Sequence, residues 1–157
     1  MKIGVISDTH GLLRPAALAA LEGCAHILHA GDVGNEEILP GLAQIAPVTA
    51  VRGNVDTQGG AGRLPLTEAI ALGGVLLYMV HRLEDLDLNP AAAGIRAVIY
   101  GHSHTPEIAW RDGVLFFNPG SAGPRRFRLP VSLGFLEISG EGALQPTLHT
   151  LAPPDPA

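Results

Sequence analysis

Two histidines, His102 and His104, stand two residues apart directly after the short apolar run 97–100. The run is typical of a buried strand, and Gly101 allows a tight turn where that strand ends. Two imidazoles at this spacing are suited to metal binding. A pair of histidines alone is weak support, because histidine is also common as an ordinary partly buried residue. The question is which other residues share the ion.

Five further candidate ligands also follow short apolar runs that we expect to be strands. They are Asp8, His10, Asp32, Asn54 and His81. Loops at the carboxyl ends of strands in an α/β sheet converge on one crevice, so these groups can meet although they are far apart in the chain. Taken singly, an Asp could cap a helix, an Asn could form a turn and a His could be a core residue. Their shared position favours one common site.

The types of ligand indicate a particular class of metal centre. Carboxylates and imidazoles with one amide oxygen and no thiolate suit Mn, Fe, Zn, Co or Ni better than Ca or a structural zinc. Seven ligands are too many for one tetrahedral ion and enough for two ions if a carboxylate bridges. Two ions about 3.5–4 Å apart can clamp both oxygens of an in-line displacement and share an activated hydroxide.

The elements that position these residues can be read from the apolar pattern. Expected strands cover 2–7, 26–29 and 48–51, and expected helices cover 14–22 and 35–45. This alternation indicates right-handed parallel crossovers. We expect Asn35 to cap the second helix and Pro40-Gly41 to break or kink it.

The remainder of the chain is mostly antiparallel in character. Expected hairpins join 66–72 to 75–80, 107–110 to 114–117 and 132–139 to 143–150, with a Gly-rich loop at 57–63 and a short helix between 84 and 93. Pro146 indicates an edge strand, because proline cannot donate a hydrogen bond to a ladder.

The length of 157 residues predicts one domain, which we place at 1–150 with a flexible tail at 151–157. Cys24 is the only cysteine, so no disulfide framework exists. The net charge of −5, with Lys2 as the only lysine, argues against binding of long nucleic acid. No apolar run is long enough to span a bilayer and no signal-peptide pattern is present, so we expect a cytoplasmic protein without a membrane contact.

In order and spacing, the candidate ligands resemble the motifs of the calcineurin-like metallophosphoesterases, in particular their small single-domain phosphodiesterase branch. The segments that carry the resemblance are Asp8-Thr9-His10, Gly31-Asp32, Gly53-Asn54-Val55-Asp56, His81, Gly101-His102-Ser103-His104, and Asn118-Pro119-Gly120-Ser121 followed by Pro124-Arg125. The resemblance implies a four-layer α/β/β/α sandwich of two mixed sheets. It also implies that Asp8, His10, Asp32 and His104 hold one metal and that Asp32, Asn54, His81 and His102 hold the other, with Asp32 as the bridge.

The activity implied by the resemblance is hydrolysis of phosphate diesters by a metal-bridging hydroxide, with two divalent ions, manganese first among them. Asp32, Asn54 and His102 would then be catalytic, and Asn54 and Arg125 would bind the substrate. Arg82 is a further candidate for substrate binding, from its position after His81 rather than from the resemblance. The expected partner is a small phosphate ester, and a homo-oligomer is left open. Two alternatives remain: a non-catalytic interaction scaffold on the same fold, and a nuclease that acts on short oligonucleotides.

Two positions depart from the family pattern. Val55 stands where the family often has a histidine that donates a proton or contacts phosphate, and valine cannot transfer a proton. This departure favours esters with good leaving groups. Arg82 stands where a glycine commonly follows the histidine. Pairing with substrate phosphate and pairing with Glu84 or Asp85 are equally compatible with its position.

Overall fold

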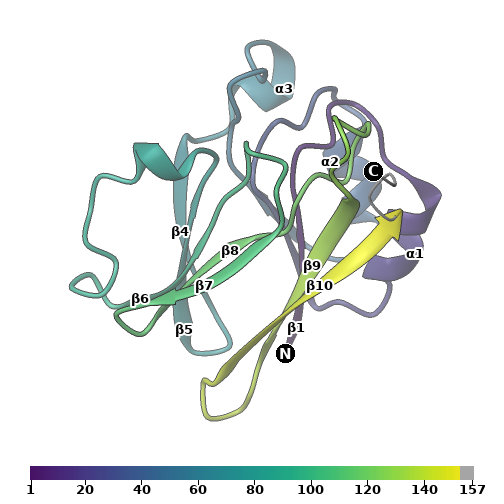
Figure 1. Ribbon diagram of the computed structural model, residues 1–157. Helices are drawn as coiled ribbons and strands as arrows, with labels where there is room; N and C mark the ends of the chain where they lie inside the picture. The colour runs from purple at the N-terminus through teal and green to yellow at the C-terminus, as the bar shows by residue number, and fades with distance from the viewer. Residues whose placement is uncertain (153–157) are drawn as a thin grey trace.

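The computed structural model describes residues 1–152, which form two five-stranded sheets packed face to face (Figure 1). The first sheet has the order β10-β9-β1-β2-β3 and the second the order β4-β5-β6-β8-β7. The strands of the first sheet are β1 (Lys2–Ile6), β2 (His26–His29), β3 (Val48–Ala50), β9 (Val131–Ile138) and β10 (Leu144–Ala152). Those of the second sheet are β4 (Thr67–Leu72), β5 (Val75–Val80), β6 (Ile95–Ile99), β7 (Glu107–Arg111) and β8 (Val114–Asn118). The expected α/β class with two mixed sheets is confirmed.

The first sheet brings the two ends of the chain together. β1 pairs in parallel with β2, and β2 pairs in parallel with β3, as the strand–helix alternation predicts. β9 runs antiparallel on the other side of β1, and β10 completes the hairpin at the edge. Pro146 therefore lies in an edge strand, as predicted.

The second sheet is more parallel than the sequence pattern indicates. β5, β6 and β8 run parallel to one another, and only the outer strands β4 and β7 are antiparallel to their neighbours. The predicted hairpins β4–β5 and β7–β8 both form, but β8 rather than β7 pairs with β6. The loop after β6 therefore crosses past the position of β8 to reach β7 at the edge of the sheet. The chain then returns through the β7–β8 hairpin to place β8 beside β6.

Three layers of apolar side chains hold the fold together. The largest cluster fills the space between the sheets and includes Leu28, Met79, Ile99 and Phe117, all fully buried. A second cluster lies between the first sheet and the helices α1 (Pro15–Leu21) and α2 (Ile38–Ala43). Figure 1 shows both helices against the first sheet, on the side away from the second. Burial of these apolar faces is the main stabilising contribution.

The outer face of the second sheet carries the third cluster, which includes Tyr78, Val80 and Phe116. Among the described residues, the cover over this face contains a single turn of 3-10 helix, η1 (Leu83–Asp85), where the sequence predicts a helix between 84 and 93. The outer layer is thus thin on this side of the sandwich.

Three local predictions are wrong. Pro40 and Gly41 lie inside α2 and do not break it, because Pro40 is in the first turn, where backbone N–H groups have no partner within the helix. Glu37 precedes the helix at the cap position, whereas Asn35 accepts a hydrogen bond from the backbone N–H of Glu37. The expected Gly-rich loop contains the short helix α3 (Gly59–Gly62).

The last strand extends two residues beyond the expected end of the domain at residue 150. β10 continues through Ala152, so the first two residues of the predicted tail are in a strand. The rest of that tail, 153–157, lies outside the described residues. Within 1–152, no helix is both long enough and apolar enough to cross a membrane.

Candidate metal centre

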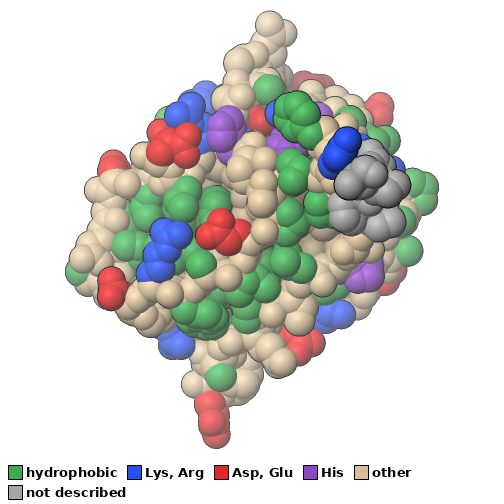
Figure 2. All heavy atoms as spheres, in the orientation of Figure 1, with side chains coloured by type: hydrophobic (Ala, Val, Ile, Leu, Met, Phe, Trp, Pro, Cys, Tyr) green, Lys and Arg blue, Asp and Glu red, His purple; other side chains and the backbone are tan. Residues whose placement is uncertain are grey.

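The seven candidate ligands lie in the loops that follow five strands. Asp8 and His10 follow β1, Asp32 follows β2, Asn54 follows β3, His81 follows β5, and His102 and His104 follow β6. β1, β2 and β3 run parallel, and so do β5 and β6, so within each sheet the loops leave from the same edge. Figure 2 shows histidine side chains together at the upper part of the molecule.

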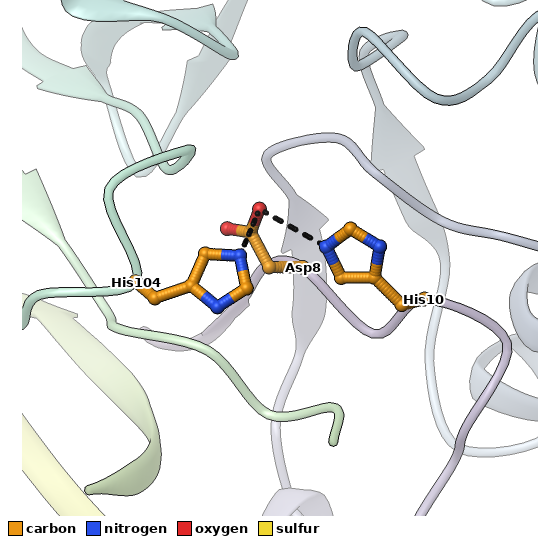
Figure 3. Close-up of side chains that lie close together, drawn as sticks. All are labelled: Asp8, His10 and His104. Carbon is orange, nitrogen blue, oxygen red and sulfur yellow. Dashed lines mark ion pairs between the residues drawn. The ribbon is translucent and has the colours of Figure 1, made fainter. Parts of the chain in front are cut away.

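The first group consists of Asp8, His10 and His104, whose ligand atoms all lie within 4.8 Å of one another (Figure 3). Asp8 Oδ1 is 3.3 Å from His104 Nε2 and 3.8 Å from His10 Nε2. Asp8 and His104 are buried, and His10 is half-buried. One carboxylate oxygen therefore faces two imidazole nitrogens from different sheets of the sandwich.

The second group consists of Asp32, His81 and His102. Asp32 Oδ2 is 3.2 Å from His81 Nε2. His81 Nδ1 donates a hydrogen bond of 2.7 Å to the carbonyl oxygen of Ala30, so Nδ1 carries a proton and Nε2 is the nitrogen that faces Asp32. A backbone partner of this kind fixes the tautomer of metal-binding histidines in many proteins.

The two aspartates connect the two groups. Asp32 Oδ2 lies 3.5 Å from His10 Nε2, in addition to its contact with His81. Asp8 Oδ1 lies 3.8 Å from His81 Nε2, in addition to its contacts in the first group. Each carboxylate therefore reaches both groups, and the geometry makes Asp8 a second candidate for the bridge beside Asp32.

The unpaired atoms of this cluster fit a bound cation. Within the described part of the chain, the buried side-chain atoms without a hydrogen-bond partner include Asp8 Oδ1, His10 Nε2, His81 Nε2 and both ring nitrogens of His104. Burial of polar atoms without partners is costly, and divalent ions would satisfy these lone pairs. The other oxygens are already used: Asp8 Oδ2 accepts from Ser7 Oγ and the His102 N–H, and Asp32 Oδ1 accepts from the Val55 N–H. The donor set is thus oriented toward one centre.

The charges of the cluster are strongly coupled. Burial alone would raise the pKa of Asp8, but His10, His104 and His81 together hold it well below its usual range. Burial likewise opposes ionisation of Asp32, whereas His81 and the Val55 N–H lower its pKa. Burial would lower the pKa of His81, but the carboxylates of Asp32 and Asp8 raise it above its ordinary value. The site therefore favours ionised carboxylates with positive charge beside them.

Comparison with known proteins identifies the family. Residues 1–141 match the calcineurin-like phosphoesterase superfamily domain. The chain belongs to that superfamily. A probable metallophosphoesterase of Methanocaldococcus jannaschii is 34% identical over 162 residues, which cover 94% of this chain and 80% of that protein. Phosphodiesterase YfcE of Escherichia coli is 30% identical over 161 residues, which cover 87% of this chain and 88% of that protein.

A solved structure shows the same fold. Vps29 of Entamoeba histolytica, complexed with zinc, superimposes with a TM-score of 0.72 at 24% identity, covering 96% of this chain and 99% of that one. The family resemblance read from the motifs is therefore confirmed at the level of the superfamily and of its fold.

The backbone at the metallophosphoesterase motifs carries a feature that residue types alone do not reveal. Five of the seven candidate ligands adopt a positive φ: Asp8 (55°), His10 (45°), Asp32 (55°), His102 (72°) and His104 (62°). Non-glycine residues rarely occupy this region, and such conformations cluster at functional sites. The glycines beside them leave room for this close packing, because a Cβ on Gly53 would collide with Asp32 and a Cβ on Gly101 would collide with Ser7.

His29 forms hydrogen bonds with the loops that carry the ligands after β1 and β2. Its Nδ1 accepts a hydrogen bond of 3.2 Å from the Gly31 N–H, and its Nε2 donates to Thr9 Oγ1 over 3.0 Å, while Thr9 Oγ1 donates to the Val33 carbonyl. The ring is fully buried, and burial lowers its pKa from an ordinary value of 6.5 to about 4. His29 is therefore a neutral residue that joins the loops after β1 and β2.

Asp56 is a second supporting residue with a role that the sequence left open. Its Oδ2 accepts from the N–H groups of Gly53 and Val33, at 2.9 and 3.1 Å, and its Oδ1 accepts from the Gly34 N–H at 3.1 Å. The buried carboxylate thus connects the loop after β2 to the loop after β3.

The other predicted site residues are Asn54, Arg82 and Arg125, and the structure brings only the first two beside the cluster. Asn54 Oδ1 accepts from His102 Nδ1 over 3.1 Å, so these two residues are in direct contact. Arg82 pairs with Glu84 at 3.1 Å and with Asp85 at 3.5 Å. Arg125 is half-buried, and its Nη1 donates to the Leu129 carbonyl over 3.1 Å.

Proposed function

We propose that the protein is a dinuclear metal-dependent phosphodiesterase. The observation that carries this proposal is the pair of three-residue groups whose buried ligand atoms lack partners and meet at shared carboxylates. Membership of the phosphoesterase superfamily supports the same chemistry. A related phosphodiesterase in Escherichia coli supports the diester class.

The proposed assignment of ligands gives each ion a set from both sheets. Asp8, His10, Asp32 and His104 would hold one ion, and Asp32, Asn54, His81 and His102 would hold the other. Bound divalent ions, which we propose to be manganese, would supply Lewis acidity that generates a hydroxide from water near neutral pH and offsets negative charge at phosphorus.

The protein groups around this centre position the phosphate. The hydrogen bond from His102 Nδ1 to Asn54 Oδ1 fixes the ring of His102 with Nε2 turned away from that contact. It also fixes the amide of Asn54, whose N–H₂ group can then donate to a phosphate oxygen. Arg125 and Arg82 would add charge-assisted contacts, which for Arg82 requires exchange of its exposed ion pairs with Glu84 and Asp85.

Val55 favours a diester with a good leaving group. Its side chain is 45% exposed, and its N–H holds Asp32, so the residue is at the site but cannot supply a proton. An alkoxide needs protonation as it leaves, whereas a phenolate or another weakly basic oxygen does not. We therefore expect aryl and similar esters to react faster than alkyl monoesters.

The test is hydrolysis of bis(p-nitrophenyl) phosphate after metal removal and after reloading with Mn, Fe, Zn, Co or Ni, with metal content measured in parallel. We expect about two ions per chain and activity that chelation abolishes. Lack of hydrolysis with every ion would contradict the proposal. A panel of short oligonucleotides separates a small-molecule diesterase from a nuclease.

A non-catalytic scaffold is the second candidate, and Val55 is the observation that favours it. Metal content alone does not separate the two, because a scaffold that keeps these ligand groups can also bind ions. Measurement of turnover separates the enzyme from the scaffold. A protein with two bound ions that hydrolyses none of the diesters would be assigned to the scaffold class.

A further inference from the structure

A pocket of about 450 Å³ adjoins the candidate metal centre on the side of the second sheet. We call it the side pocket. Its lining includes Asn54 and His81 at the metal centre, together with Arg52, Leu66, Tyr78 and Val80. A second hollow is lined by residues at the opposite end of the first sheet, including Met1 and Glu137, and shares no lining residue with the centre.

The thin outer layer of the fold explains why the side pocket exists. Along β5, Leu77 and Met79 point into the core between the sheets, and Tyr78 and Val80 point to the outer face. Among the described residues, this outer face is covered near His81 by the single turn η1 rather than by a longer helix. Tyr78 and Val80 are therefore left as the apolar floor of a hollow beside the metal centre.

Leu66 extends the apolar surface of the pocket toward solvent. It stands directly before β4, and 61% of its side chain is exposed although it is a large apolar residue. A single exposed leucine is common on protein surfaces, but Leu66 shares the lining of this pocket with Tyr78 and Val80, so the three together form an apolar surface that a ligand can contact.

The charges around the side pocket are balanced. Arg52 Nη1 donates to the Gly62 carbonyl over 3.0 Å, and Arg82 is paired with Glu84 and Asp85. Asp85 and Asp87 also line the pocket, so the lining contains two arginines and two aspartates. Figure 2 shows acidic and basic side chains beside a histidine at the upper left, over the teal turn of Figure 1 that contains η1. A second phosphate or a carboxylate would be repelled by Asp85 and Asp87 and would have to displace the carboxylates paired with Arg82, whereas an uncharged group meets neither cost.

We propose that the side pocket binds an uncharged, ring-bearing organic group of the phosphodiester, and that Leu66 selects it over a small alkyl group. This inference rests on the proposed phosphodiesterase function, because Asn54 and His81 would place the phosphorus at the mouth of the pocket. The volume lies within the usual range of small-molecule sites and is ample for a phenol or a nucleoside.

The test uses the zinc-loaded, diamagnetic protein and two probes, phenyl phosphate and methyl phosphate. The probes share the phosphate and differ only in the group that would enter the pocket. We expect phenyl phosphate to bind more tightly by calorimetry and to shift the methyl resonances of Leu66 and Val80 through its ring current. Methyl phosphate should leave these resonances unchanged.

Substitution of the pocket residue makes the test specific. Leu66→Ala should weaken phenyl phosphate binding about five-fold and leave methyl phosphate binding unchanged. Leu148→Ala is the matched control, because Leu148 is also a partly exposed leucine, on the edge strand β10 outside the pocket. Equal affinities for the two probes, no methyl shifts, or equal affinities of the Leu66→Ala and Leu148→Ala proteins for phenyl phosphate would each overturn the inference.

The experiment also separates this inference from the proposed function. If the protein binds phenyl phosphate through Leu66 but hydrolyses none of the diesters, the pocket assignment stands and the activity falls. If it hydrolyses diesters with no dependence on Leu66, the activity stands and the pocket assignment falls.

Discussion

Asp8 and Asp32 are the residues on which the electrostatics of the site depend. Both carboxylates are buried, each has one oxygen held by hydrogen bonds, and the other oxygen of each faces histidines of both groups. Removal of charge from either should reduce metal binding, because only one carboxylate then remains among ligands that are otherwise neutral.

The first prediction concerns Asp32→Asn. We expect loss of most bound metal and a fall in diesterase activity larger than the roughly 10–100-fold typical for partners that only support a ligand. Metal content by mass spectrometry and kcat/KM on bis(p-nitrophenyl) phosphate would measure it. Asp112→Asn, in an exposed turn that also has a positive φ, is the control. Near-normal metal content in Asp32→Asn would contradict the proposed ligand assignment.

The second prediction concerns the missing proton donor. Val55→His places an imidazole on a side chain that is 45% exposed, so the fold should tolerate it. Because proton donation to the leaving group contributes about 10²–10⁴-fold in favourable geometry, activity on alkyl phosphate monoesters should rise at least ten-fold. Val55→Gln is polar but not acidic and should give no such gain. Equal gains from both substitutions would show that proton transfer is not involved.

At this scale the sequence correctly placed the seven residues after strands, since each follows an apolar run that does form a strand, while their role as metal ligands stays a prediction. It did not predict that five of them have a positive φ, because that conformation depends on contacts between loops. The hydrogen bonds that His29 and Asp56 make could not be predicted from the sequence either. Their partners are backbone N–H groups and a threonine hydroxyl that only the folded chain brings near.

At the scale of elements, the strands were predicted with nearly correct bounds because apolar runs bounded by glycine and polar residues define them. The failures have local causes. Pro40 is harmless in the first turn of α2, and the partners of β8 are decided by long-range packing that sequence neighbours do not encode. The thin cover over the second sheet, which leaves the side pocket open, was likewise not predicted.

The third prediction follows from the connection that His29 makes between the loops after β1 and β2. Its folded pKa, about 4, is below its ordinary value of 6.5, so the unfolded chain binds a proton more readily than the folded one. The contribution to stability is complete above pH 6.5 and is lost as the pH falls from 6.5 to about 4, for a total of about 3 kcal/mol.

Two measurements check this prediction. NMR titration should show the His29 ring neutral, with a proton on Nε2, down to about pH 4. Urea unfolding should show a steeper loss of stability with falling pH in the wild-type protein than in His29→Gln, in which the titrating group is gone. A His29 resonance that titrates near 6.5 would disprove the assignment.

At the scale of the whole molecule, the metal centre joins the two sheets of the sandwich. Asp8, His10, Asp32 and Asn54 come from loops of the first sheet, whereas His81, His102 and His104 come from loops of the second. Bound ions would therefore connect the layers at one end, where the centre contains buried carboxylates and unpaired imidazole nitrogens. Metal removal should then loosen the contact between sheets rather than unfold either sheet by itself.

The fourth prediction is the size and place of that effect. A metal present at about 100 times its Kd stabilises the folded state by about 2.7 kcal/mol, which for a chain of this length corresponds to a rise in Tm of roughly 5–10 °C. Hydrogen exchange should increase after chelation in the loops that follow β1, β2, β3, β5 and β6, with little change in the β9–β10 hairpin, which contributes no candidate ligand. The Asp8→Asn/Asp32→Asn double variant is the control, since chelator should leave its Tm unchanged. If chelation lowers the Tm of this variant as much as that of the wild-type protein, the stabilising ions are bound elsewhere, and the two-sheet centre is not what holds them.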